Sequence, residues 1–232
     1  GESGQSVSAF TIVGIALASA LVPLNSTMIA VALPTLSDEF DITRGDAAVL
    51  VTIYLAAMLI GQPLSGRLAD AVGARRLGII AVSGFGLCSA AAMFAPTFTV
   101  LVAIRAAQAA FASALSPSVQ SLLRAITTPS ERGRAFGVQG SVIGVGAGLG
   151  PVIGGLLLAG FGWRAIFAVN IPIVIVVLIV LQRSVPVDAH STDEEIEAGS
   201  PTSGESDGDS PRLFNRVFSA AFATQALSVF AQ

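Results

Sequence analysis

The chain has no lysine, and it has only one histidine, one cysteine, one tyrosine and one tryptophan in 232 residues. A single cysteine cannot form an intrachain disulfide, and with so few cysteine and histidine side chains no metal site is expected. Charged residues make up 12% of the sequence, about half the share of an ordinary soluble domain. The long apolar runs contain no acidic residue and no nucleophile–base pair, so we expect no enzyme and no catalytic residue. No nucleotide-binding motif occurs, so no cofactor is implied, and nothing in the sequence supports binding to nucleic acid.

Apolar residues make up 53% of the chain, and they gather in six runs that are long enough to cross a lipid bilayer. A helix needs about 20 residues to cross roughly 30 Å of hydrocarbon. The sequence therefore predicts an all-α integral membrane protein with spans at approximately Ala9–Leu33, Ala47–Ser65, Leu77–Ala95, Phe98–Leu122, Ala135–Ala159 and Ala165–Leu181. We expect Pro34, Pro96 and Pro129 in the loops, whereas Pro23 falls inside the first span.

The placement of arginine predicts the orientation of the helices, because cytoplasmic loops of membrane proteins carry an excess of basic residues. With the N-terminus in the cytoplasm, the outer loops hold only Arg44 and Arg164. The inner side then holds nine arginines, which are Arg67, Arg75, Arg76, Arg124, Arg132, Arg134, Arg183, Arg212 and Arg216. We therefore expect a multi-pass protein of the cytoplasmic (inner or plasma) membrane, with its N-terminus in the cytoplasm.

The composition changes after the sixth apolar run. Residues 183–213 are rich in Ser, Asp, Glu, Gly and Pro, and such a stretch cannot bury enough apolar surface to fold alone. We expect a flexible acidic cytoplasmic linker there. Residues 214–232 are apolar again but stop short of a full span, so we expect the beginning of a truncated seventh helix. The predicted domains are a six-helix transmembrane unit over 1–182, this linker, and the start of helix seven.

The loop between the second and third spans has a distinctive order of residues. It reads Gly66-Arg67-Leu68-Ala69-Asp70-Ala71-Val72-Gly73-Ala74-Arg75-Arg76. Gly73 suits a turn that a side chain would hinder, and Asp70 lies near a helix end, where it can cap backbone donors or pair with arginine. The loop resembles the signature loop of the major facilitator superfamily. That resemblance implies a conformational switch formed by Gly66, Asp70, Gly73, Arg75 and Arg76.

The fourth span contains Arg105 and, three residues later, Gln108. A buried arginine in a membrane helix is costly, so it is by default a functional candidate. The pair resembles a motif that the same family associates with proton transfer in exporters. Arg105 is also the only formal charge within the predicted spans, which favours anionic or neutral substrates over cations.

The fifth span carries a glycine- and proline-rich motif made of Gly146, Gly150, Pro151, Gly154 and Gly155. Gly146, Gly150 and Gly154 recur every four residues, so they share one helix face, which lets the backbone of another helix approach closely. All five positions match the antiporter signature of the family. The resemblance therefore favours export over uptake.

The first span contains Asn25, Thr27 and Met28, and it resembles the first helix of the drug–proton antiporter branch of the family. Asn25 stands where that branch has an aspartate, and an amide does not titrate in the biological range. If transport is coupled to protons, the titrating carboxylate is Asp70 or Asp46 near the membrane ends, or it belongs to a second half. The expected substrate and proton path is lined by Asn25, Thr27, Met28, Arg105 and Gln108.

The resemblance implies a fold of two six-helix halves, each built from two inverted three-helix repeats. This chain would be the N-terminal six-helix bundle. Its partner would be a second half, either a missing C-terminal part or a dimer mate, and the fifth span would face it. We expect a proton-driven secondary transporter that exports drug-like molecules or metabolites by alternating access.

Two other functions stay open at this point. One is an uptake permease of the same superfamily for a sugar or an organic acid, which would carry the same signature loop. The other is a membrane sensor or assembly subunit that keeps the fold without transporting. The number of helices in the parent fold is also open, although the position of the linker suits twelve better than fourteen.

Overall fold

The computed structural model describes residues 9–184, which form seven helices connected by short turns. The helices are α1 (Ala9–Phe40), α2 (Arg44–Val72), α3 (Ala74–Met93), α4 (Phe98–Ile126), α5 (Pro129–Phe161), α6 (Arg164–Ala168) and α7 (Asn170–Ser184). Only Val169 separates α6 from α7, and the two together make one membrane-length run over Arg164–Arg183. Six helical runs in the described range are thus long and apolar enough to cross a membrane, which confirms the all-α, six-span prediction. The predicted seventh helix and linker residues 185–213 lie outside the described residues.

Threonines begin several of these helices and glycines end two of them. The Thr43 hydroxyl accepts a hydrogen bond from the Asp46 backbone N–H at 3.1 Å, and the Asp46 carboxylate accepts one from the Thr43 backbone N–H at 3.3 Å. A capping box of this kind satisfies backbone donors that the first turn of a helix leaves free. Gly73 and Gly162 follow the last residues of α2 and α5 with φ values of 89° and 76°, which favour glycine over any residue with a side chain.

The first span continues past the point where it was expected to end. Pro34 was predicted to lie in a loop, but it lies inside α1, which reaches Phe40. A proline removes a single backbone donor, and membrane helices tolerate that loss where neighbouring helices pack around it. Leu36 is 1% exposed and packs in the same cluster as Trp163, and the Phe40 ring lies 5.7 Å from the Trp163 ring. This packing explains why the helix extends beyond Pro34.

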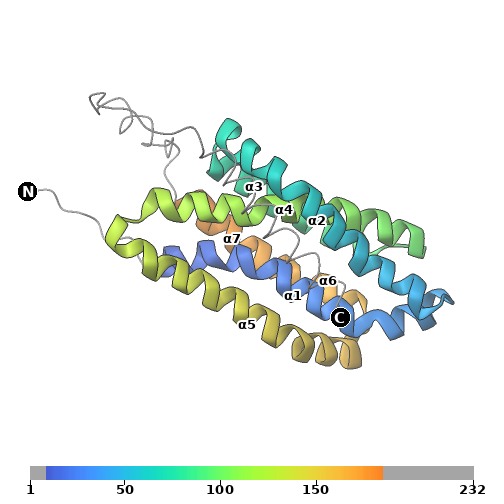
Figure 1. Ribbon diagram of the computed structural model, residues 1–232. Coiled ribbons are helices and arrows are strands. Elements are labelled where there is room, and N and C mark those ends of the chain that lie inside the picture. Colours follow the sequence, from blue (N-terminus) through green and yellow to red (C-terminus); the bar gives the residue numbers. More distant parts are fainter. Residues whose placement is uncertain (1–8, 185–232) are drawn as a thin grey trace, which may run out of the picture. The chain divides into compact units, whose positions relative to one another are not determined.

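The six spans form two groups of three. One group is α1, α2 and α3, and the other is α4, α5 and the span that α6 and α7 make together. Helices of one group pack crosswise against helices of the other. The first helix of each group packs along the second helix of the other, so that α1 runs beside α5 and α4 runs beside α2 (Figure 1). The third helix of each group also packs beside the first helix of the other, with α3 against α4 and α7 against α1. Two inverted three-helix repeats, which the family resemblance implied, would produce this pattern.

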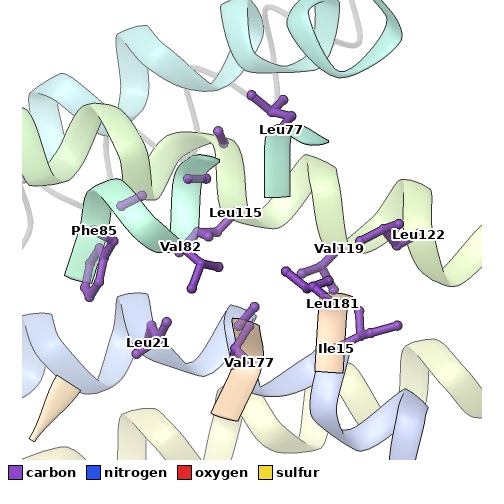
Figure 2. Packing of buried hydrophobic residues seen from close by; sticks show 14 of the residues in the cluster. Ile15, Leu21, Leu77, Val82, Phe85, Leu115, Val119, Leu122, Val177 and Leu181 are labelled. Carbon is purple, nitrogen blue, oxygen red and sulfur yellow. The ribbon is translucent and has the colours of Figure 1, made fainter. Parts of the chain in front are cut away.

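Two apolar clusters fill the bundle. One is built by α1, α3, α4 and α7, which bring Ile15, Phe85, Leu115 and Val177 together (Figure 2). The other lies toward the opposite end of α1 and includes Trp163. α2 and α5 contribute least, since only 22% and 17% of the most apolar windows of these two helices are buried. Both helices therefore present long apolar faces outside the bundle.

Candidate functional site

The predicted switch loop lies where α2 ends and α3 begins. Gly66 and Asp70 lie in the final part of α2, and Gly73 separates the two helices. The positive φ of Gly73, 89°, confirms the prediction that this turn requires a residue without a side chain. The side chain of Asp70 is outside the described part of the structure, so its capping or pairing role stays a prediction.

Arg75, in the first turn of α3, ties this loop to the sixth span. Its Nε donates to the carbonyl oxygen of Leu181 at 3.1 Å, and its Nη2 donates to that of Gln182 at 3.0 Å. Both carbonyls belong to the last turn of α7, where a helix leaves four carbonyls without intrahelical partners. A cation also suits the negative end of the helix dipole. Arg76, beside it, is exposed.

Four of the five residues predicted to line the path are enclosed by the bundle. Asn25, Met28, Arg105 and Gln108 all have 0% of their surface exposed. Thr27 is half-buried, and its hydroxyl donates to a backbone carbonyl one turn earlier in α1 at 2.8 Å. The structure places these residues on α1 and α4 but opens only Thr27 to the surface, so a path through the other four stays a prediction.

Arg105 is part of a buried polar network that joins four helices. Its Nη1 donates to Gln108 Oε1 at 2.6 Å, and Gln108 Nε2 donates to Ser89 Oγ of α3 at 2.7 Å. Asn170 of α7 also donates to Ser89 Oγ, through Nδ2 at 3.2 Å. The guanidinium carbon of Arg105 lies 4.0 Å from the centre of the Tyr54 ring of α2, a cation–π contact. The predicted pair is therefore the centre of a larger network.

Ser89 and Asn170 were missed by the sequence analysis. The available signal was weak, because each is a single polar residue in an apolar run, and such residues more often make ordinary contacts between helices. Both are 0% exposed, and Ser89 accepts from two amides on two other helices.

Several buried polar atoms of α1, α2 and α4 have no hydrogen-bond partner among the described residues. They include Nε and Nη2 of Arg105 itself, both amide atoms of Asn25, and the hydroxyls of Ser26 and Tyr54. Ser26 lies close to the Tyr54 hydroxyl but not in hydrogen-bonding geometry. Buried polar atoms are normally paired, so each of these requires an explanation.

The described acidic side chains lie at the ends of helices. Glu39 pairs with Arg164 at 3.3 Å, and Asp46 and Glu131 are capping residues in the first turns of α2 and α5. Among the described side chains, no group of three His, Cys, Asp or Glu residues is placed to hold a metal ion. The interior of the described spans thus holds the cation of Arg105 without a carboxylate beside it.

The glycine row of α5 faces α1. A Cβ atom added at Gly150 would overlap Thr27, and one at Gly154 would lie 3.0 Å from the Cα of Met28. One at Gly146 would lie 3.3 Å from a carbonyl oxygen of α1. Real Cβ atoms rarely approach so closely, so the row confirms the expected close approach of two helix backbones.

This placement shows which face of the fifth span is already covered. The glycine row packs against α1 of the same bundle, and the expectation that the fifth span faces a second half stays a prediction. The other residues of the motif lie differently, since Pro151 is exposed and a Cβ at Gly155 would meet nothing within 4 Å. Any surface that α5 offers to a second half is therefore the face with Pro151, away from the row.

The sequence matches the family model described as Major Facilitator Superfamily over residues 15–231. It is 38% identical over 176 residues to the multidrug efflux pump LfrA of Mycolicibacterium smegmatis, covering 74% of this chain and 34% of that protein. It is 38% identical over 169 residues to the puromycin resistance protein pur8 of Streptomyces alboniger, covering 72% and 34%. It is 35% identical over 191 residues to the methyl viologen resistance protein SmvA of Salmonella typhimurium, covering 82% and 38%. The chain spans about a third of the length of these curated relatives.

The fold is also similar to that of solved transporters. A crystal structure of the peptide transporter POT in complex with sulfate has a TM-score of 0.69 and 17% identity, covering 97% of this chain and 46% of that one. An inward-facing bacterial homologue of the lysosomal transporter Spinster has a TM-score of 0.65 and 17% identity, covering 90% and 48%. At this identity the likeness concerns the fold alone. Together, the six membrane-length helices and the family match show a multi-pass membrane protein that belongs to the major facilitator superfamily.

Proposed function

We propose that the full-length protein exports small molecules across the cytoplasmic membrane as a secondary transporter that works by alternating access. Three relatives at 35–38% identity are named as a multidrug efflux pump or as resistance proteins, and the two resistance proteins are named for chemically different compounds. These names support drug-like molecules or metabolites as the proposed substrates.

The observation that carries the proposal is the contact between α1 and α5. Gly150 and Gly154 belong to the residues that match the antiporter motif, and they bring the backbone of α5 close to that of α1. An interface made of backbone and small side chains has few interlocking groups, and one buried hydrogen bond, donated by Gln139 Nε2 of α5 to Ser19 Oγ of α1 at 3.0 Å, also joins the two helices. Such an interface suits a helix pair that moves during alternating access.

The bundle would form the N-terminal half of the transporter and pack against a second six-helix half. The apolar faces that α2 and α5 leave unburied are available for that role. The N-terminus and the linker of residues 183–213 would lie in the cytoplasm, and residues 214–232 would begin the seventh helix. The bias of arginine toward one side supports this orientation.

Protons are the proposed coupling ion. Asn25 cannot carry one, so the titrating group would be Asp70, Asp46 or a carboxylate of the second half. The switch loop with Asp70 and Arg75 would steady one end state, and Arg75 holds the end of α7 for this purpose.

The test is transport by the full-length protein in membranes. Inverted vesicles from expressing cells would be given a panel of anionic, neutral and cationic fluorescent compounds, and their uptake would be followed with and without a protonophore. We expect at least one compound to accumulate, and we expect the protonophore to abolish accumulation. Transport that ignores the protonophore would remove proton coupling, and stable insertion without transport of any compound would favour the non-transporting alternative.

A further inference from the structure

Arg105 is an interior cation with an open binding edge. Its Nη1 is engaged by Gln108, whereas its Nε and Nη2 have no partner among the described residues. Nε and Nη2 lie on the same side of a guanidinium and point in the same direction, which is the arrangement that grips both oxygens of a carboxylate. The face of the guanidinium is covered by the Tyr54 ring at 4.0 Å, which fixes the plane of that edge.

Other unpaired polar groups of α1 and α2 are able to donate hydrogen bonds. The hydroxyls of Ser26 and Tyr54 are buried without partners, and so is the amide of Asn25, the residue before Ser26. Hydroxyl and amide N–H groups can donate to the same acceptor, and an anion satisfies several donors at once. A cation could not do so, since it would face the charge of Arg105.

No described carboxylate is in place to satisfy Arg105. The described acidic side chains lie at helix ends, and the described ion pair of Glu39 with Arg164 is one of these. Asp70 follows Tyr54 by 16 residues on α2, which corresponds to roughly 24 Å along a helix at 1.5 Å per residue. An unpaired charge inside a membrane helix is costly, so the missing anion is expected to arrive with a ligand.

Arg105 and Tyr54 lie only one side chain below the surface of the bundle. Ser26 is half-buried, its hydroxyl is buried near Tyr54, and Tyr54 covers Arg105. The next residue, Thr27, is half-buried as well. A small shift of α1 at these two residues would open the cluster.

We propose that the Nε–Nη2 edge of Arg105, with Ser26, Tyr54 and Asn25, binds the carboxylate of a transported compound, so that organic anions are the substrate class. This assignment rests on the proposed export function and narrows it.

The experiment compares three probes that differ only in the charged group. The purified full-length protein in lipid nanodiscs would be titrated calorimetrically with 2-naphthoate, 2-naphthamide and 2-naphthylmethylammonium. We expect the naphthoate to bind at least roughly tenfold more tightly than the amide, because hydrogen bonds to a charged acceptor are the stronger kind. We expect the ammonium compound to bind more weakly than both.

The variant Arg105→Gln tests whether the preference for the carboxylate comes from the Nε–Nη2 edge of Arg105. The variant is expected to bind the naphthoate and the amide equally, while the matched control Arg124→Gln, which removes an exposed arginine from the same helix, keeps the wild-type ratio. If the Arg105 variant does not fold, the three wild-type affinities still decide whether organic anions are the preferred class, and a folded variant that keeps the wild-type ratio overturns the assignment to Arg105. Equal binding of the three probes, tighter binding of the ammonium compound or no binding of the naphthoate overturns the assignment. Export of other compounds in the vesicle assay would show that the transport function survives that failure.

Discussion

The two crosswise helix pairs are held together in different ways, although they occupy equivalent places in the two repeats. α1 and α5 meet through glycine, so that Gly150 brings the backbone of α5 against Thr27. α4 and α2 also approach closely, since a Cβ atom added at Gly61 would overlap Ser113, but this pair adds the charge of Arg105 stacked on Tyr54. Both pairs thus use a glycine contact, and in the described residues the second pair combines it with a buried charge.

The two interfaces differ in how much relative motion of the paired helices they allow. Glycine contacts depend on distance but not on bond direction. Each pair also has a direct side-chain hydrogen bond, from Gln139 Nε2 to Ser19 Oγ at 3.0 Å in α1–α5 and between the hydroxyls of Ser65 and Ser113 at 3.0 Å in α2–α4. Hydrogen bonds have preferred angles, and α2–α4 adds the stack of Arg105 on Tyr54 to its own. We therefore expect more motion at α1–α5 than at α2–α4.

Arg105→Gln removes the central group of the α2–α4 pair, and it should have the largest effect. Gln108 loses its charged donor and Tyr54 loses its cation, and a hydrogen bond to a charged group contributes about 1.5–3 kcal/mol. We expect transport to fall at least about tenfold, which corresponds to about 1.4 kcal/mol. Vesicle uptake measures the fall in transport, and thermal unfolding in detergent measures any loss of stability. Wild-type transport by a correctly inserted variant would show that the network is dispensable.

Gly150→Ala closes the gap in the α1–α5 pair. The added methyl group would overlap Thr27, and overpacking of this kind costs about 1–3 kcal/mol. Thermal unfolding of the purified protein should show the loss. The control is Gly137→Ala on the same helix, where a Cβ meets nothing within 4 Å and where stability should be unchanged. Thr27→Ala should restore part of the stability of Gly150→Ala. Equal stability of the Gly150 and Gly137 variants would contradict the close approach of α1 and α5.

Arg75→Gln tests a contact outside both pairs. It removes the cation that binds the last carbonyls of α7, and a charge at a helix end contributes about 0.3–1 kcal/mol. We expect a small loss of stability together with faster hydrogen exchange in the last turn of α7. Arg76→Gln removes an exposed neighbour and should leave that exchange unchanged. Identical exchange in the two variants would show that Arg75 does not hold α7.

Ser65→Ala should have the smallest effect. It removes one hydroxyl of the Ser65–Ser113 pair, and polar contacts between membrane helices contribute about 0.6 kcal/mol on average. Ser113 keeps a second bond to the Ala110 carbonyl oxygen at 2.7 Å, so it is not left unsatisfied. Thermal unfolding should shift by an amount near that average. A loss larger than that of Arg105→Gln would mean that the α2–α4 pair depends on this bond more than on Arg105.

The number and approximate position of the spans could be predicted, because the length of an apolar run and the bilayer thickness decide them. The turn at Gly73 was also predictable, since few residues other than glycine adopt its φ of 89°. The extension of α1 beyond Pro34 was not, because it depends on packing of Leu36 and Phe40 near Trp163. That contact joins segments more than 100 residues apart.

The charge at the centre of the candidate site could be predicted, but the residues of other helices that complete its hydrogen-bond network could not. Arg105 is conspicuous because it is a charge in an apolar run. Ser89 and Asn170 have no such signal, and only the packing of α3 and α7 brings them together. The direction of the glycine row likewise depends on which helix arrives beside it. Spacing of four residues shows that Gly146, Gly150 and Gly154 share a face but not which partner that face meets.

The crosswise pairing also sets the order in which the bundle can assemble as it is synthesised. Gly150 follows Thr27 by 123 residues, so at about 5–20 residues per second α1 waits roughly 6–25 s for the helix that covers it. During that time the uncovered face of α1 is exposed to lipid or to the insertion machinery. Thr27 is suited to this delay, because its hydroxyl already bonds to carbonyls of its own helix at 2.8 and 3.1 Å. The residue that meets Gly150 in the finished bundle therefore needs no partner while α1 is still alone.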